Sequence, residues 1–308
     1  MQTVKNKIII HEVGLRDGLQ NEKQIVSLEK KQHWLEMLFA ARLPMIQVGS
    51  FVHPDKVPQM ADTDRLFAEL NASGKKPKNV ILSALVLNEK GLERGLACGV
   101  DMFCMGVSAS NTHSLKNTGM STAEAVSRII PMAKKALAEG KKVQVSVQSA
   151  FGCGFEGRVP EQTVLDIVKQ YLDAGLLSIS LADTAGYAYP TQVMELFGRI
   201  QELDKNVECA CHFHDTFGAG IVNCYAALQS GVTVFETAFG NLGGCPFTKI
   251  GSGNVCTEDL VYLFQREGFS GLPDLEILLQ LSKDVALELN RELSGRLLKA
   301  GIPAIVKE

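Results

Sequence analysis

Eight short runs of β-branched and apolar residues recur along the chain, and stretches with helical periodicity separate them. This alternation is typical of βαβ units that share a parallel sheet. Eight such units within 308 residues predict a closed (β/α)₈ TIM barrel and not an open, doubly wound sheet. We expect the strands at residues 8–13, 45–51, 80–86, 100–107, 142–148, 176–183, 207–214 and 232–237.

Two helical stretches, 257–265 and 275–290, follow the last strand and exceed what a barrel requires. We expect them to cap or flank it. No low-complexity tract or linker-like Pro/Ser run divides the chain, although its length would also accommodate two half-sized domains. The prediction is a single domain with a barrel at about 8–267 and a helical extension at about 268–308. Further helices are expected at 27–41, 121–139, 161–174, 191–203 and 218–229.

Composition excludes several classes of function. With 46% hydrophobic and 21% charged residues, the chain can bury a large core. A net charge of -3 provides no field that would attract nucleic acid or an anionic membrane. No apolar stretch approaches the roughly 18 residues of a membrane span. The eight cysteines are scattered and include no Cys-x-x-Cys pair, so we expect a cytoplasmic protein with reduced thiols.

The expected strand at 207–214 carries two histidines separated by one residue. Side chains alternate along a strand, so His212 and His214 share one face with Glu208 and Ala210, while apolar residues occupy the other. The apolar face must pack under the helices, which turns both imidazoles into the barrel at its carboxyl end, where barrel enzymes carry their chemistry. Such a pair can hold one metal ion. A pair that only forms hydrogen bonds in a polar interior is the alternative.

A long glycine-rich loop, residues 240–254, leaves the last strand. Long loops in this position usually bind ligands or close over them. Cys245 lies between glycines and a proline, where a packing role is hard to justify, so we predict that it is catalytic or contacts a ligand. Five other cysteines lack this context and are expected to fill the core: Cys98, Cys104, Cys153, Cys224 and Cys256.

The first strand ends in a motif that pairs a cation with a carboxylate. Gly14 and Gly18 bracket Arg16 and Asp17, and glycines permit a sharp turn that would present both charges at the barrel mouth. An Arg-Asp dipeptide is often only a surface ion pair. Here it lies at the strand end that is expected to face the two histidines.

These motifs resemble those of the DRE-TIM metallolyases, and among them the 3-hydroxy-3-methylglutaryl-CoA (HMG-CoA) lyases, over nearly the whole chain. The matching stretches are EVGLRDGLQNEK (12–23), SFVHPDKVPQMAD (50–62), 151–157, ADTAG (182–186), HFHDTFG (212–218) and 242–260. The resemblance implies a carbon–carbon lyase that cleaves a 3-hydroxyacyl-CoA, HMG-CoA or a close relative, to acetyl-CoA and a keto acid such as acetoacetate. It also implies a homodimer.

The resemblance assigns a metal site and a set of reacting groups. Two nitrogens and two oxygens suit an octahedral Mg²⁺ or Mn²⁺, and the implied ligands are Asp17, His212, His214 and Asn254. The implied catalytic residues are Arg16 at the thioester carbonyl, Cys245 as the acid, Asp183 in proton transfer, and His212. The implied contacts to the acyl-CoA are Gln20, Asn21, Lys23, Gln47 and Ser50.

Two departures from the family pattern bear on the substrate. The lyases carry a glutamate before the Ser-Phe-Val stretch, where this chain has Gln47. The last loop reads FGNLGGCP where AGLGGCP is expected. A shorter or differently charged relative such as citramalyl-CoA is therefore an alternative substrate. The alternative functions are a Claisen-type condensing synthase and a barrel that binds metal and acyl-CoA without turnover.

Overall fold

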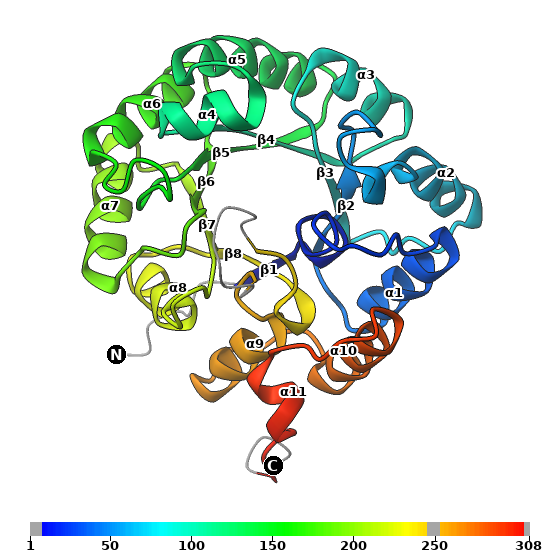
Figure 1. The fold of residues 1–308 in the computed structure, drawn as a ribbon. Coiled ribbons are helices and arrows are strands. Elements are labelled where there is room, and N and C mark those ends of the chain that lie inside the picture. The colour runs from blue at the N-terminus through cyan, green and yellow to red at the C-terminus, as the bar shows by residue number, and fades with distance from the viewer. Residues whose placement is uncertain (1–7, 245–252, 305–308) are drawn as a thin grey trace.

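The computed structural model describes residues 8–244 and 253–304. Its strands are β1 (Ile9–Glu12), β2 (Met45–Ser50), β3 (Ile81–Leu85), β4 (Met102–Ser108), β5 (Lys142–Gln148), β6 (Ser178–Asp183), β7 (Glu208–Phe213) and β8 (Val234–Thr237). All eight are parallel and pair in chain order, and β8 closes the barrel on β1 (Figure 1). The predicted TIM barrel is confirmed.

Helices surround the barrel (Figure 1), and side chains cap the starts of several of them. At one of them Ser121 and Glu124 form a capping box, in which each side chain accepts the other's backbone N–H. The helices are α1 (Leu28–Ala40), α2 (Thr63–Ser73), α3 (Glu89–Ala97), α4 (Asn111–Thr118), α5 (Thr122–Ala138), α6 (Glu161–Asp173), α7 (Pro190–Leu203), α8 (Gly220–Gln229), α9 (Thr257–Arg266), α10 (Leu275–Glu288) and α11 (Arg296–Ala300).

The C-terminal helices flank the barrel from outside. This is one of the two expected arrangements, in which the helices either cap or flank the barrel. Helix α10 packs against α1 and α9 (Figure 1). Trp34 of α1 donates its indole N–H to Asp284 of α10 at 2.7 Å, which fixes the contact between these helices. Within residues 8–244 and 253–304, no helix is long and apolar enough to cross a membrane.

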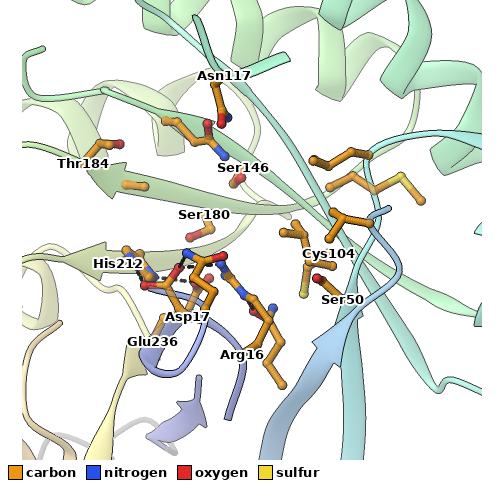
Figure 2. A pocket seen from close by; sticks show the side chains of 18 of the residues that line it. Arg16, Asp17, Ser50, Cys104, Asn117, Ser146, Ser180, Thr184, His212 and Glu236 are labelled. Atoms are coloured by element: carbon orange, nitrogen blue, oxygen red, sulfur yellow. Dashed lines mark hydrogen bonds and ion pairs between the residues drawn. The ribbon is translucent and has the colours of Figure 1, made fainter. Parts of the chain in front are cut away.

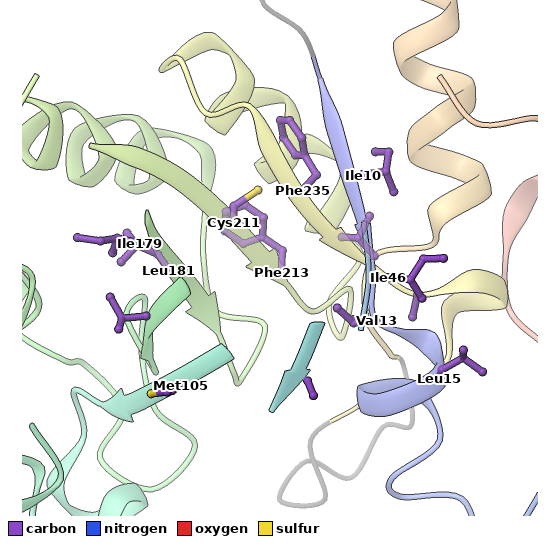
Figure 3. Close-up of a cluster of buried hydrophobic side chains, with 14 of the residues drawn as sticks. Ile10, Val13, Leu15, Ile46, Met105, Ile179, Leu181, Cys211, Phe213 and Phe235 are labelled. Carbon is purple, nitrogen blue, oxygen red and sulfur yellow. The ribbon is translucent and has the colours of Figure 1, made fainter. Parts of the chain in front are cut away.

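The main hydrophobic core lies between the strands and the surrounding helices. Ile179 and Leu181 of β6 and Cys211 and Phe213 of β7 project into it (Figure 3). The intervening residues of these strands project into the barrel. This pattern confirms the alternation predicted for the strand that carries His212, because its apolar face packs under the helices.

A second, smaller cluster fills the barrel interior at the amino end of the strands. It consists of Met45, Met102 and Cys104. Cys104 is buried, as expected, but it lies inside the barrel and not under the helices. Its Sγ is 3.7 Å from Gln144 Oε1, and it contributes to the floor of the pocket above.

Candidate active site

A pocket of about 310 Å³ occupies the carboxyl end of the barrel (Figure 2). All eight strands or the loops that follow them contribute residues to its lining. This volume is at the lower end of the range for small-molecule sites. Two short helical turns follow β1 and β8 at the mouth: η1 (Gly14–Gly18) and η3 (Phe239–Asn241).

The two histidines face each other in this pocket. Their Nε2 atoms are 3.2 Å apart. His212 Nδ1 lies 2.9 Å from Glu236 Oε2, and His214 Nδ1 lies 3.1 Å from the Thr184 carbonyl oxygen. These acceptors favour ring protons on Nδ1, so both Nε2 lone pairs are directed at one point. Two such lone pairs repel each other unless a proton or a cation lies between them.

Asp17 and Asn254 lie beside the histidine pair. Asp17 Oδ2 is 3.8 Å from His212 Nε2 and accepts a hydrogen bond from Asn254 Nδ2 at 2.8 Å. Asn254 Oδ1 is buried and has no hydrogen-bond partner among the residues that the structure describes. A buried carbonyl oxygen without a partner, next to a carboxylate and two imidazole nitrogens, fits a divalent cation. The structure therefore brings together all four predicted ligands, and they form a candidate metal site.

Close backbone packing carries Asn254 to this point. Asn254 pairs with His214 as an isolated antiparallel bridge. At Gly253, a Cβ atom would lie 2.2 Å from the Asn241 carbonyl oxygen. At Gly243, where φ is 91°, a Cβ atom would lie 2.5 Å from Asn254 Nδ2. These glycines are thus required by the contacts that position a ligand.

The Arg-Asp motif forms a single π-helical turn, η1, where the sequence predicted a sharp turn. Neither Gly14 nor Gly18 has a positive φ, so their conformational freedom is not what the turn needs. A Cβ atom at Gly14 would lie 2.5 Å from the Phe239 ring, and one at Gly18 would lie 2.9 Å from Leu242. The glycines let the turn pack tightly against the segment that follows β8.

This turn places Arg16 between a carboxylate and a neutral amide. Its Nη1 forms an ion pair with Asp17 Oδ1, and its Nε donates to Gln47 Oε1. Gln20 Nε2 donates to the same Asp17 oxygen at 2.9 Å. Burial raises the pKa of Asp17, but Arg16 and the two histidines lower it more, so it lies well below its usual range. Asp17 is therefore ionised at neutral pH.

Glu236 is a site residue that the sequence reasoning missed. The register of β7 and β8 places it opposite His212. Burial raises the pKa of Glu236, but the hydrogen bond and the charge of His212 lower it by more, so the net shift is downward. Burial lowers the pKa of His212, but Glu236 outweighs this effect and the net shift is upward. The available signal was alternation, because the charged Glu236 follows the apolar Val234 and Phe235 on β8.

Within the described part of the chain, no carboxylate is hydrogen-bonded to the His214 ring, and burial lowers the pKa of His214 to about 4. At neutral pH the imidazole of His214 is therefore uncharged, which is the form that binds a metal ion. His212 and His214 thus differ in basicity because only His212 is paired with Glu236.

The predicted CoA contacts fall into two groups. Four of them line the pocket: Gln20, Asn21, Gln47 and Ser50. Asn21 Nδ2 also donates to the Gly244 carbonyl oxygen at 2.9 Å, so it contacts the start of the last loop. Lys23 is exposed and does not line the pocket. Cys245 lies outside the residues that the structure describes, and its role stays a prediction.

Asp183 is not brought to the pocket wall. Its carboxylate oxygens accept hydrogen bonds from the backbone N–H groups of Tyr187 at 2.8 Å and Ala188 at 3.0 Å. Burial raises its pKa to about 6. These contacts order the loop between β6 and α7, and they leave the part of Asp183 in proton transfer as a prediction.

The fold and this site together define a TIM-barrel protein with a candidate metal centre at the carboxyl end of its strands. The model of the family described as HMGL-like matches residues 7–285. The chain belongs to this family.

Individual relatives match nearly the full length. The hydroxymethylglutaryl-CoA lyase YngG of Bacillus subtilis is 35% identical over 290 residues, which cover 94% of this chain and 96% of that protein. The (R)-citramalyl-CoA lyase of Chloroflexus aurantiacus is 35% identical over 300 residues, with coverage of 96% and 95%. An HMG-CoA lyase from Acinetobacter baumannii, solved in complex with coenzyme A and 3-methylmalate, is similar with a TM-score of 0.91 at 34% identity, with coverage of 98% and 97%.

Proposed function

We propose that this chain is a divalent-metal-dependent carbon–carbon lyase that cleaves HMG-CoA, or a close 3-hydroxyacyl-CoA, to acetyl-CoA and a keto acid. The observation that carries the proposal is the convergence of Asp17, His212, His214 and Asn254 beside Arg16. The names of the relatives, which include lyases of HMG-CoA and citramalyl-CoA, support the same reaction class. Mg²⁺ or Mn²⁺ is proposed because the ligand set mixes oxygen with imidazole nitrogen and leaves room for substrate.

Two negative charges develop during the reaction and need stabilisation, one on the C3 oxygen and one on the thioester enolate. A divalent ion held by the four ligands would supply Lewis acidity that favours loss of the C3 hydroxyl proton. When the C2–C3 bond breaks, its electron pair remains on C2 and becomes a thioester enolate, while C3 becomes a ketone carbon. Arg16 lies beside the ligand set and carries a permanent charge, so it is placed to stabilise the enolate oxygen. Asp17 and Gln47 hold its guanidinium in position.

The enolate must then take up a proton at C2 to become acetyl-CoA. We assign this proton to the Cys245 thiol, on the ground of its place in the glycine-rich loop. A positioned acid typically contributes about 10² to 10⁴ in rate. The C3 hydroxyl must also lose a proton. Asp183 stays the predicted participant in proton transfer, and its contacts with the Tyr187 and Ala188 backbone add no support for that role.

Charge in the pocket favours an acyl group that bears one carboxylate. Among the lining residues that the structure describes, Arg16 is the permanent cation, and Asp17 and Glu236 are the carboxylates. With a divalent ion bound and both histidines neutral, one positive charge remains to be balanced. HMG and citramalyl groups each carry one carboxylate. Citramalyl-CoA is the second candidate substrate, because Gln47 replaces the glutamate that is typical of the lyases.

The test is a metal-dependence and substrate assay. The chelated protein receives HMG-CoA or citramalyl-CoA with Mg²⁺, Mn²⁺ or no metal, and release of acetyl-CoA and the keto acid is followed. We expect release only with metal, loss of release in His214→Ala, and normal release in the control His53→Ala, which changes an exposed histidine. Metal-independent release would contradict the proposal. Release of free coenzyme A from acetyl-CoA and a keto acid, with no C2–C3 cleavage of HMG-CoA or citramalyl-CoA, would indicate a synthase. Binding of the acyl-CoA without turnover in either direction would indicate a noncatalytic barrel.

Two further proposals concern the protein as a whole. We retain the homodimer that the resemblance implies, and light scattering of the purified protein tests it. The cytoplasmic location also stays a prediction, which fractionation of cells that produce the protein would test.

A further inference from the structure

The barrel interior contains an unusually open layer just below the metal site. Interior layers of TIM barrels are normally filled by bulky branched side chains. Two residues nearer the amino end than His212, the register of β4 to β7 brings four small residues side by side: Gly106, Ser146, Ser180 and Ala210. At about 3.3 Å per residue, this layer lies roughly 7 Å below the level of His212.

The pocket extends into this layer. Ser146 and Ser180 line it, and Figure 2 shows both on the wall across from Arg16. Ser146 remains half-buried although it lies inside the barrel. A Cβ atom at Gly106 would lie 2.0 Å from Ser146 Oγ, so β4 cannot supply a side chain that fills the space. Cys104 contributes to the floor underneath.

A second observation points to a ligand in this layer. Ser180 is 1% exposed, and its Oγ has no hydrogen-bond partner within normal geometry among the residues described. It lies near Glu236, whose pKa its hydroxyl helps to lower. A buried hydroxyl without a partner is costly, so a polar atom supplied by substrate would satisfy it.

The direction of the substrate follows from the barrel. The coenzyme A part of a bound substrate extends out of the barrel through its mouth, where Gln20 and Asn21 lie. The thioester then lies near Arg16, the C3 hydroxyl lies at the ligand set, and the remaining branches of C3 point down into the open layer. This argument rests on the proposed lyase function.

We infer that the layer of Gly106, Ser146, Ser180 and Ala210 is the subsite for the branches of C3, and that it accepts an alkyl branch longer than methyl. The Ser180 hydroxyl borders the layer, where it can donate to Glu236 or to a polar atom of the substrate. The alkyl branch runs past Ser146 towards Cys104. Neither the four residues of the layer nor Cys104 carries a charge at neutral pH, which suits an uncharged branch.

A series of substrates tests the inference. The protein is assayed with 3-hydroxy-3-alkylglutaryl-CoA thioesters in which the alkyl group is methyl, ethyl or propyl. We expect kcat/KM for ethyl and propyl to equal or exceed the value for methyl. Ser146→Leu should lower the propyl-to-methyl ratio of kcat/KM at least tenfold, with Ser146→Val as a smaller change if the leucine variant does not fold. Ser127→Leu, the same substitution at an exposed position of α5, should leave that ratio unchanged.

A binding measurement separates this inference from the lyase proposal. 3-Alkylglutaryl-CoA lacks the hydroxyl and cannot be cleaved, so the change of its Kd with the length of the alkyl group reports the subsite. Cleavage of the methyl substrate, together with a tenfold loss of affinity and of kcat/KM for each added carbon, would overturn the inference and leave the lyase function standing. A ratio unchanged in both Ser146 variants would also overturn it. Tighter binding of longer branches without cleavage of any thioester would support the subsite and refute the lyase.

Discussion

Replacing Glu236 by glutamine should weaken metal binding by about one order of magnitude. The amide keeps the size of the carboxyl group and an oxygen that can accept the proton on His212 Nδ1, now 2.9 Å from Glu236 Oε2. It removes the negative charge that raises the basicity of the imidazole. The orientation of His212 should therefore persist while its strength as a ligand falls.

The magnitude follows from the nature of this hydrogen bond. A buried hydrogen bond to a charged group contributes about 1.5–3 kcal/mol, and a neutral one about 0.5–1.5 kcal/mol. The loss of roughly 1–1.5 kcal/mol corresponds to about a tenfold change in Kd, at the lower end of the effects seen when groups behind a metal ligand are changed.

Isothermal titration of the chelated protein with MnCl₂ and MgCl₂ measures this directly. Glu208→Gln is the matched control, since it changes an exposed glutamate on the same strand, β7, at the end remote from the site. We expect the control to bind metal as the wild type does. A Kd within twofold of the wild type in Glu236→Gln, while His212→Ala abolishes binding, would refute the reasoning that the charge of Glu236 supports the ligand.

Four further perturbations test the site. Arg16→Gln should lower kcat at least 100-fold while the metal Kd stays near the wild-type value, because its partner is the developing enolate; a change confined to KM would make it a ground-state contact. Cys245→Ser should abolish turnover with the melting temperature retained, since a hydroxyl is a far weaker acid, and an active serine variant would remove the thiol from the reaction. Burial raises the pKa of Glu12 to about 8, so the folded protein holds a proton that the unfolded chain releases at lower pH, and stability falls as pH rises from about 5 to 8. Glu12→Gln should show a flatter melting temperature over that range, and parallel curves would contradict this. Gly253→Ala should weaken metal binding and lower the melting temperature, because its Cβ would lie 2.2 Å from the Asn241 carbonyl oxygen; unchanged titration and melting curves would show that the loop absorbs the methyl group.

Much of the fold is predictable because its signals are local. The strand positions follow from short apolar runs, and the structure shortens most of them by one or two residues at their ends. The inward direction of His212 follows from the two-residue period of a strand and needs no knowledge of its neighbours. The capping box at Ser121 is equally local.

Other parts of the site depend on how separate segments meet. The pairing of Glu236 with His212 requires the register of two strands, and no pattern within either strand specifies it. The approach of Asn254 to Asp17 depends on glycines packed against backbone 12 residues away in the chain, at Asn241. The π-helical turn was not predicted. Its Gly14 is needed because the Phe239 ring packs closely against it, and not because of a local backbone preference.

By itself, the sequence determined the barrel and the face on which the histidines lie, since periodicity and order along the chain are sufficient for these. The set of four candidate ligands came from the resemblance of its motifs to those of a known family. Only the tertiary structure decided that Asp183 binds its own loop, that Glu236 supports His212, and that an open layer lies beneath the ligands. The physical reason is that such contacts join atoms far apart in sequence, and their geometry is set by strand register and loop packing.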